Sequence, residues 1–230
     1  MNEKSNRESG ILEAPATESI RRIALGHLDS AREALAQMDA GDEDEALHDF
    51  RVSLRRLRTI LKAYRPLLEP EVSRKDRRAI RKLTRSTGGG RDAEVLLAWL
   101  ESVQSDLAPS EGPMAERLAA ELREERDSGY GAVLDSVGPR FRKIEKRLRA
   151  RLASYDLPDR PTRPGEERSF AAVLYRLFPV YAADLAEAVA EIHTPEDHDA
   201  VHATRIRGKH LRYLIEALEP EVEGVEALLK

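Results

Sequence analysis

Apolar residues recur along this chain at intervals of three and four positions, and no stretch alternates between apolar and polar residues with a period of two. That spacing places the apolar side chains on one face of an α-helix, so helices are predicted throughout and no strand is predicted. Pro and Gly residues mark the ends of the predicted helices. We therefore predict an all-α fold, with helices over residues 17–38, 42–65, 71–87, 92–107, 113–136, 139–154, 169–192, 195–218 and 221–230.

A Pro-rich linker, residues 157–168, divides the predicted helices into two groups. The groups contain related sequences: DEDEALHDFRVSLRRLR begins at residue 42 and EDHDAVHATRIRGKHLR begins at residue 196. In this internal repeat, His48, Arg51 and Arg58 recur as His202, Arg205 and Arg212. We therefore predict a disordered N-terminal tail over residues 1–15 and one domain over 16–230, with a first helical half at 16–156 and a second at 169–230.

The composition excludes several classes of protein. None of the 230 residues is a cysteine, which excludes disulfide scaffolds, thiolate metal sites and cysteine nucleophiles. No apolar run is long enough to span a bilayer. The N-terminal residues lack the apolar segment of a secretory signal, so a cytoplasmic location is expected.

The formal net charge of −4 conceals an uneven distribution of charge along the chain. Residues 51–91 contain fourteen basic residues and three acidic ones, residues 140–151 contain seven and one, and residues 201–213 contain four and none. The compensating acidic residues lie elsewhere, among them those in 92–135 and 216–226. Net charge is therefore a poor guide to the partners of this protein.

On helical wheels, the basic residues of these segments form stripes beside the apolar faces. Like charges three or four residues apart destabilise a helix by about 0.2 to 0.5 kcal/mol per pair, and a polyanion would relieve that repulsion. Arg56 and His210 lie on other sides of their helices, where we expect contacts with solvent or a partner. The candidate polyanion-binding residues are His48, Arg51, Arg55, Arg58, Lys62, Arg74, Arg78, Arg81, Arg85, Arg91, Arg142, Lys146, Arg149, His202, Arg205, Lys209 and Arg212.

The two repeated motifs, residues 48–58 and 202–213, together with the segment 80–92 that ends in Gly-Gly-Gly-Arg-Asp, resemble the CHAD family, the conserved-histidine α-helical domain. The resemblance covers about residues 20–219. It implies two antiparallel helical bundles related by pseudo-twofold symmetry, with a basic central channel that binds inorganic polyphosphate. Family members are often attached to triphosphatase tunnel domains, and some collect on polyphosphate granules.

Two departures from the family pattern affect the second half. Family members usually carry a further basic helix after the second motif, whereas residues 221–226 are largely acidic here. Glu216 also stands where the first repeat has Lys62. The second half is therefore predicted to be shortened and its basic stripe weakened.

Three alternatives remain open beside polyphosphate binding. His198 and His202 are four residues apart on a predicted helix and could share a divalent metal ion. A generic nucleic-acid-binding surface is disfavoured, because the stripes lack aromatic residues for base stacking and Asn or Gln for base readout. Catalysis is disfavoured because the stripes contain no carboxylate except Glu216, and the Gly-rich segment does not match a P-loop. We expect non-catalytic polyphosphate binding, with no cofactor and no membrane insertion.

Overall fold

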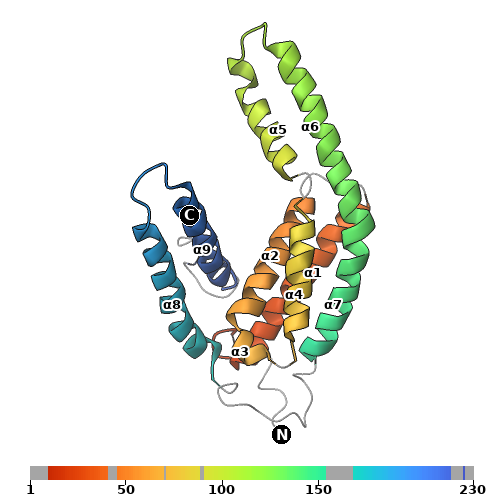
Figure 1. The fold of residues 1–230 in the computed structure, drawn as a ribbon. Helices are drawn as coiled ribbons and strands as arrows, with labels where there is room; N and C mark the ends of the chain where they lie inside the picture. Colours follow the sequence, from red (N-terminus) through yellow and green to blue (C-terminus); the bar gives the residue numbers. More distant parts are fainter. Residues whose placement is uncertain are drawn as a thin grey trace. The chain divides into compact units, whose positions relative to one another are not determined.

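The computed structural model describes residues 10–40, 46–69, 71–88, 91–153, 168–218 and 225. Regular secondary structure in these residues is helical (Figure 1), apart from an isolated bridge between Pro15 and Ser169. The predicted all-α fold is confirmed. The helices are α1 (Ala16–Asp39), α2 (Ala46–Ala63), α3 (Arg65–Leu68), α4 (Arg74–Ser86), α5 (Arg91–Val103), α6 (Gly112–Ala132), α7 (Gly138–Ala153), α8 (Phe170–Ala190) and α9 (His198–Glu216). A 3₁₀ turn, Gln104–Asp106, follows α5, and a π-helical turn, Val133–Val137, joins α6 to α7.

The predicted helices correspond closely to α1, α2 and α4 to α9, whereas the sequence pattern missed the single turn of α3. Helix α9 begins at His198, three residues later than predicted. The carboxylate of Asp197 accepts hydrogen bonds from the backbone N–H groups of His193 and Thr194, at 2.8 and 2.9 Å, and so stabilises a turn before the helix. The predicted helix at 221–230 falls almost wholly outside the described residues, as do residues 157–167 of the predicted linker.

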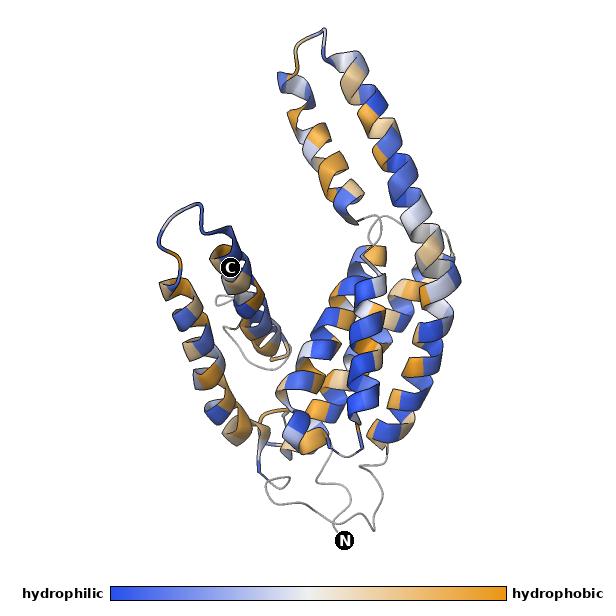
Figure 2. Ribbon diagram, viewed as in Figure 1, coloured by the Kyte–Doolittle hydropathy of each residue, from blue (hydrophilic) through white to orange (hydrophobic). Residues whose placement is uncertain are grey.

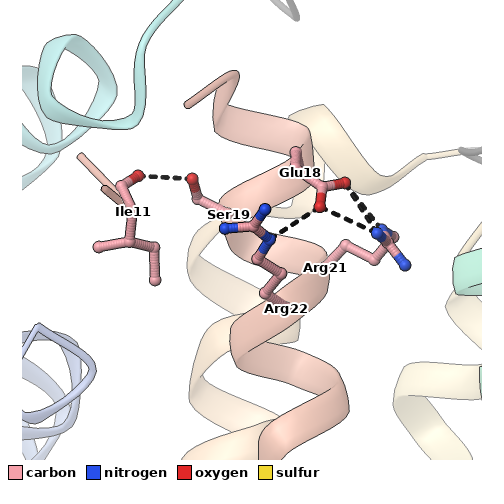
Figure 3. Close-up of polar contacts among 5 residues, drawn as sticks. All are labelled: Ile11, Glu18, Ser19, Arg21 and Arg22. Atoms are coloured by element: carbon pink, nitrogen blue, oxygen red, sulfur yellow. Dashed lines mark hydrogen bonds and ion pairs between the residues drawn. The ribbon is translucent and has the colours of Figure 1, made fainter. Parts of the chain in front are cut away.

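The N-terminal segment is ordered earlier than the sequence predicted. Ile11 and Ala14 are buried, and the Ser19 hydroxyl of α1 donates a hydrogen bond to the Ile11 carbonyl at 2.6 Å (Figure 3). The backbone N–H of Phe170 donates to the carbonyl of Ala14 at 3.0 Å, which fastens the same segment to the start of α8. The predicted disordered tail over residues 1–15 is therefore wrong for residues 10–15, while residues 1–9 lie outside the described part.

Contacts group the chain into two compact units, each built from separate segments. The α4–α7 unit comprises residues 28–55 and 74–149, and the α8–α9 unit comprises residues 1–27, 56–73 and 150–230. Helices α1, α2 and α7 each contribute residues to both units. The grouping thus differs from the two consecutive halves expected from the repeat, because long helices pass from one unit into the other.

Aromatic and aliphatic side chains form the core of the α4–α7 unit. The rings of Phe50 on α2 and Phe141 on α7 meet edge to face, with centroids 5.2 Å apart. Ile80 and Leu83 bury the apolar face of α4. Helices α5 and α6 form an antiparallel hairpin in this unit (Figure 1), with its own small core that includes Leu97.

The α8–α9 unit has a separate core. Tyr64, directly after α2, packs its ring against Phe170 at the start of α8, with centroids 5.6 Å apart. Helices α8 and α9 lie side by side (Figure 1), and the Thr204 hydroxyl donates to the Ala188 carbonyl at 2.9 Å. Leu214 of α9 is fully buried. Among the described residues, no helix is both long enough and apolar enough to cross a membrane.

Candidate anion-binding surfaces

Helix α4 is the most strongly basic element of the α4–α7 unit. It carries seven basic residues and one acidic residue, Asp76, and Figure 2 shows hydrophilic residues along most of the helix. Asp76 is 1% exposed and accepts a hydrogen bond from Nε of Arg147 on α7 at 2.7 Å. The one acidic side chain of α4 therefore faces the core. The charged residues on the outer surface of the helix are all basic.

Four arginines form a stripe on this outer surface. Within the part of the chain that the structure describes, none of the four has an acidic partner. Neighbouring members of the stripe are three or four residues apart, so their mutual repulsion destabilises α4 by about 1 kcal/mol in total. The α4 stripe consists of the exposed residues Arg74, Arg78, Arg81 and Arg85.

Other exposed helices of the same unit show the ordinary arrangement of charge. On α6, Nε of Arg117 lies 3.3 Å from the carboxylate of Glu121, four residues along the helix. On α1, Arg32 pairs with Asp29 at 2.8 Å. Such pairs stabilise a helix modestly and cancel its charge locally. The α4 stripe lacks this compensation.

On α2, the residue at the centre of the predicted stripe is buried. Nε of Arg51 donates to the carbonyl of Thr87, and Nη1 of Arg51 lies 3.1 Å from the carboxylate of Glu94 on α5. These contacts fasten α2 to the residue after α4 and to the first turns of α5. We therefore interpret Arg51 as a residue that positions the neighbouring helices rather than as a direct anion ligand.

The other α2 candidates are more accessible. His48, Arg55 and Arg58 are half-buried, and Lys62 is exposed. From His48 to Lys62 the helix rises about 21 Å, at 1.5 Å per residue. Accessible cations thus lie along most of α2.

Helix α9 carries a second basic surface, but acidic groups neutralise part of it. Glu216, whose side chain is 5% exposed, accepts a hydrogen bond from Nε of Arg212 at 2.6 Å and another from Nε of Arg56 at 2.8 Å. Arg207 pairs with Asp184 of α8 at 3.1 Å. Arg56, expected to contact solvent or a partner, is part-exposed and in addition pairs with Glu216, which joins α2 to α9.

His210 was not among the predicted binding residues, but it lies close to the positive charges of Lys62 and Arg58. Burial, and then the positive charges of Lys62 and Arg58, lower the pKa of His210, while Asp184 raises it. Because Lys62 and Arg58 belong to α2, the wheel of α9 alone could not reveal this proximity. His202 and Arg205 are exposed on α9, and Lys209 is half-buried.

The candidates on α7 lie mostly on a side where acidic residues neutralise them. Arg142 donates to Asp39 of α1, and Arg149 lies 2.7 Å from Asp29 of α1. Arg149 also pairs with Glu145 at 2.9 Å. Lys146 is exposed. The predicted α7 stripe therefore does not add a free basic face comparable with that of α4.

The remaining candidates are Arg91, which follows the Gly-rich segment, and the two histidines of the metal hypothesis, His198 and His202. Helix α4 ends at Ser86, before the three glycines, as predicted. Arg91 begins α5, and its side chain lies outside what the structure describes. His198 and His202 are both exposed, and within the described ranges no three His, Asp or Glu residues form a group that could hold a metal ion.

Comparison with known proteins places the chain in a family. Its sequence matches the family model described as "CHAD domain" over residues 22–230. A solved CHAD domain from the plant Ricinus communis superposes with a TM-score of 0.73 and 23% identity, covering 95% of this chain and 71% of that one. PptA from Streptomyces chartreusis gives a TM-score of 0.64 and 21% identity, with 91% and 77% of the two chains covered. A search of curated proteins finds no match. The chain belongs to the CHAD domain family.

Proposed function

We propose that this protein binds inorganic polyphosphate without cleaving it. The observation that carries the proposal is the α4 stripe, four exposed arginines with no acidic partner among the described residues. Membership of the CHAD family is consistent with polyphosphate as the ligand. A chain of phosphates supplies the negative charge that relieves repulsion within the stripe, and it requires no aromatic surface for base stacking.

Each unit carries its own proposed set of accessible cations. The set of the α4–α7 unit consists of His48, Arg55 and the α4 stripe, and the set of the α8–α9 unit consists of Arg58, Lys62, His202, Arg205, Lys209 and His210. We omit Arg51, Arg142, Arg149 and Arg212 as ligands, because each is already engaged with an acidic group. Lys146 is omitted because Arg142 and Arg149, the other candidates on its side of α7, pair with acidic residues of α1. The central channel implied by the family resemblance stays a prediction.

Within either set of cations, many weak contacts to one polymer add up to strong binding. The planar guanidinium of arginine matches two phosphate oxygens at once. Each contact at an exposed position is worth about 1 kcal/mol or less, so affinity depends on the number of contacts made by one polymer. Release of counterions makes such binding fall steeply with salt concentration. The same contacts would hold the protein on polyphosphate granules in the cytoplasm.

The proposal that binding is non-catalytic follows from the chemistry of the surface. Hydrolysis of a phosphoanhydride generally needs carboxylates that hold metal ions beside the phosphates. The exposed side of α4 presents only basic and neutral side chains. We therefore expect bound polyphosphate to remain intact.

The proposal is tested by titrating the protein with long-chain polyphosphate, single-stranded RNA and zinc chloride at matched ionic strength. We expect polyphosphate to bind most tightly, with an affinity that falls linearly with salt on a double logarithmic plot. RNA binding of equal strength would instead indicate a generic basic surface, and tight zinc binding would support the metal hypothesis. Release of orthophosphate over hours would contradict the non-catalytic assignment.

A further inference from the structure

Helix α7 has two basic sides, and only one is neutralised. Arg142 and Arg149 face acidic residues of α1, as described above. A different set of cations, Arg140, Lys143 and Arg147, lines a groove between α7 and α4. The helical wheel of α7 predicted that the first set binds anions, because the wheel of one helix does not show where the acidic residues of another helix lie.

The groove is formed within the α4–α7 unit, and both of its helices contribute basic residues to the lining. Its basic lining consists of Lys75 and Lys82 from α4 and Arg140, Lys143 and Arg147 from α7. Most of the groove's own surface is apolar, and Ala79, Leu83 and Ile144 are among its lining residues. Five basic residues from two helices therefore border one groove.

The groove has little negative charge of its own. Arg147 is engaged with the buried carboxylate of Asp76. Among the described residues, Lys75, Lys82, Arg140 and Lys143 have no acidic partner, and all four are exposed. Exposed cations that border one groove without counter-charges produce a local positive potential that attracts anions.

The groove is continuous with the α4 stripe around the surface of α4. With Arg78 at 0° on the helical wheel, Lys82 and Lys75 lie at about 40° and 60°. Arg85 and Arg81 lie on the other side, at about 340° and 300°. The exposed circumference of α4 is therefore basic from the stripe to the edge of the groove, with no acidic residue between them.

We propose that the α4–α7 groove is a second phosphate-binding site, which takes a further segment of the same polyphosphate chain that occupies the α4 stripe. This inference rests on the proposed function. One polymer that has bound the stripe presents its next phosphates to the groove at a high effective concentration, so the second contact adds affinity beyond that of the stripe. The groove is thus a reason for long chains to bind more tightly than short ones.

The test compares two variants with equal changes of charge. The groove variant carries Lys75→Glu, Lys82→Glu and Lys143→Glu. The control variant carries Arg117→Glu, Arg123→Glu and Lys146→Glu, three exposed positions of the same unit outside the groove. We expect the groove variant to bind long-chain polyphosphate about tenfold more weakly than wild type and the control to change less than about threefold. An equal loss in both variants, or no loss in the groove variant, would overturn the inference.

A second measurement uses the wild-type protein and therefore does not depend on the folding of a variant. Lysine acylation is followed by mass spectrometry with and without long-chain polyphosphate. Polyphosphate should slow the modification of Lys75, Lys82 and Lys143 severalfold relative to Lys146, which lies on the same helix as Lys143 but outside the groove. Equal protection of Lys143 and Lys146 would contradict the groove assignment. If the wild-type protein does not bind polyphosphate, the proposed function is wrong. If the wild-type protein and the groove variant bind it equally well, only the groove assignment is wrong.

Discussion

Helices α4 and α9 look alike in sequence, since each carries a stripe of basic residues, but the structure surrounds them differently. The α4 stripe is exposed and has no acidic partner among the described residues. On α9, Arg207 pairs with Asp184 and Arg212 pairs with Glu216. The electrostatic potential at the surface of a basic helix therefore depends on which carboxylates of neighbouring helices pack beside it. We also expect α4 to dominate polyanion binding.

The two helices also differ in the partner of their buried acidic residue. Asp76 of α4 points into the core and pairs with Arg147 of α7, away from the stripe. Glu216 of α9 is nearly as buried, but its carboxylate pairs with Arg212, a member of the basic surface, and so neutralises part of the charge of that surface. An ion pair to a buried carboxylate therefore leaves the positive charge of the α4 surface intact but reduces the positive charge of the α9 surface.

The largest effect is expected from reversing charges on the α4 stripe. The triple change Arg78→Glu, Arg81→Glu and Arg85→Glu removes three attractive contacts and introduces three repulsive ones, each worth about 1 kcal/mol or less at an exposed site. We expect the affinity for long-chain polyphosphate to fall about a thousandfold, roughly 4 kcal/mol, and the salt dependence to become shallower. Titrations at several salt concentrations measure both quantities.

The matched control lies on α9. The triple change Arg205→Glu, Arg207→Glu and Arg212→Glu alters the charge equally but affects two residues that are already neutralised. We expect a loss of about tenfold or less. Equal losses from the two helices would show that α4 has no special role.

A histidine of the α8–α9 unit, His27, is expected to lower the stability of the protein in acid. Burial, and then the charge of Arg56, lower the pKa of His27 from 6.5 to about 4, although Glu216 raises it. The unfolded chain takes up a proton below pH 6.5 and the folded chain only near pH 4, so stability is lost as pH falls through this window. The expected loss is about 3 kcal/mol.

Denaturant unfolding at pH 7 and pH 4 measures this loss. The comparison variant is His27→Gln, which carries no titrating group at this position. Its free energy of unfolding should depend less on pH than that of wild type by about the same 3 kcal/mol. An identical pH dependence in the two proteins would rule out His27 as the cause.

Glu216→Gln tests whether the buried carboxylate weakens the α9 surface. Removal of the charge leaves Arg56 and Arg212 without their ionic partner, so we expect a loss of about 2 kcal/mol in the free energy of unfolding, less than for a fully buried pair. It also frees Arg212 for phosphate, so polyphosphate affinity should rise about threefold.

Glu187→Gln, at an exposed position on α8, serves as the control and should change stability by less than about 0.5 kcal/mol. A fall in affinity for Glu216→Gln would contradict the interpretation.

The smallest expected effect concerns protonation of His210. Lys62 and Arg58 help to hold its pKa low in the free protein, and bound polyphosphate would offset their charges and raise it. Binding should therefore take up protons, and affinity should increase about threefold between pH 7.5 and pH 6. Calorimetry in buffers of different ionisation enthalpy measures the proton uptake, which should decrease in His210→Gln. An unchanged uptake in that variant would exclude His210 as the proton acceptor.

The sequence by itself determined the helical fold, because the period of apolar residues is a local property that fixes which face of each helix is buried. The end of α4 before the glycines and the exposed position of its stripe follow from the same local pattern. The repeated motifs sufficed to identify the family resemblance that the family model confirms. These features need no knowledge of how one helix packs against another.

Only the tertiary structure decided which of the basic residues remain available to an anion. The partners that engage Arg51, Arg142 and Arg149 lie 43, 103 and 120 residues away in the sequence. The pairing of Arg56 with Glu216 spans 160 residues. A helical wheel records the direction of each side chain on its own helix, whereas neutralisation depends on a carboxylate a few ångströms away on another helix. That distance is set by packing, which is why the stripes of similar sequence on α4 and α9 differ in the charge they present.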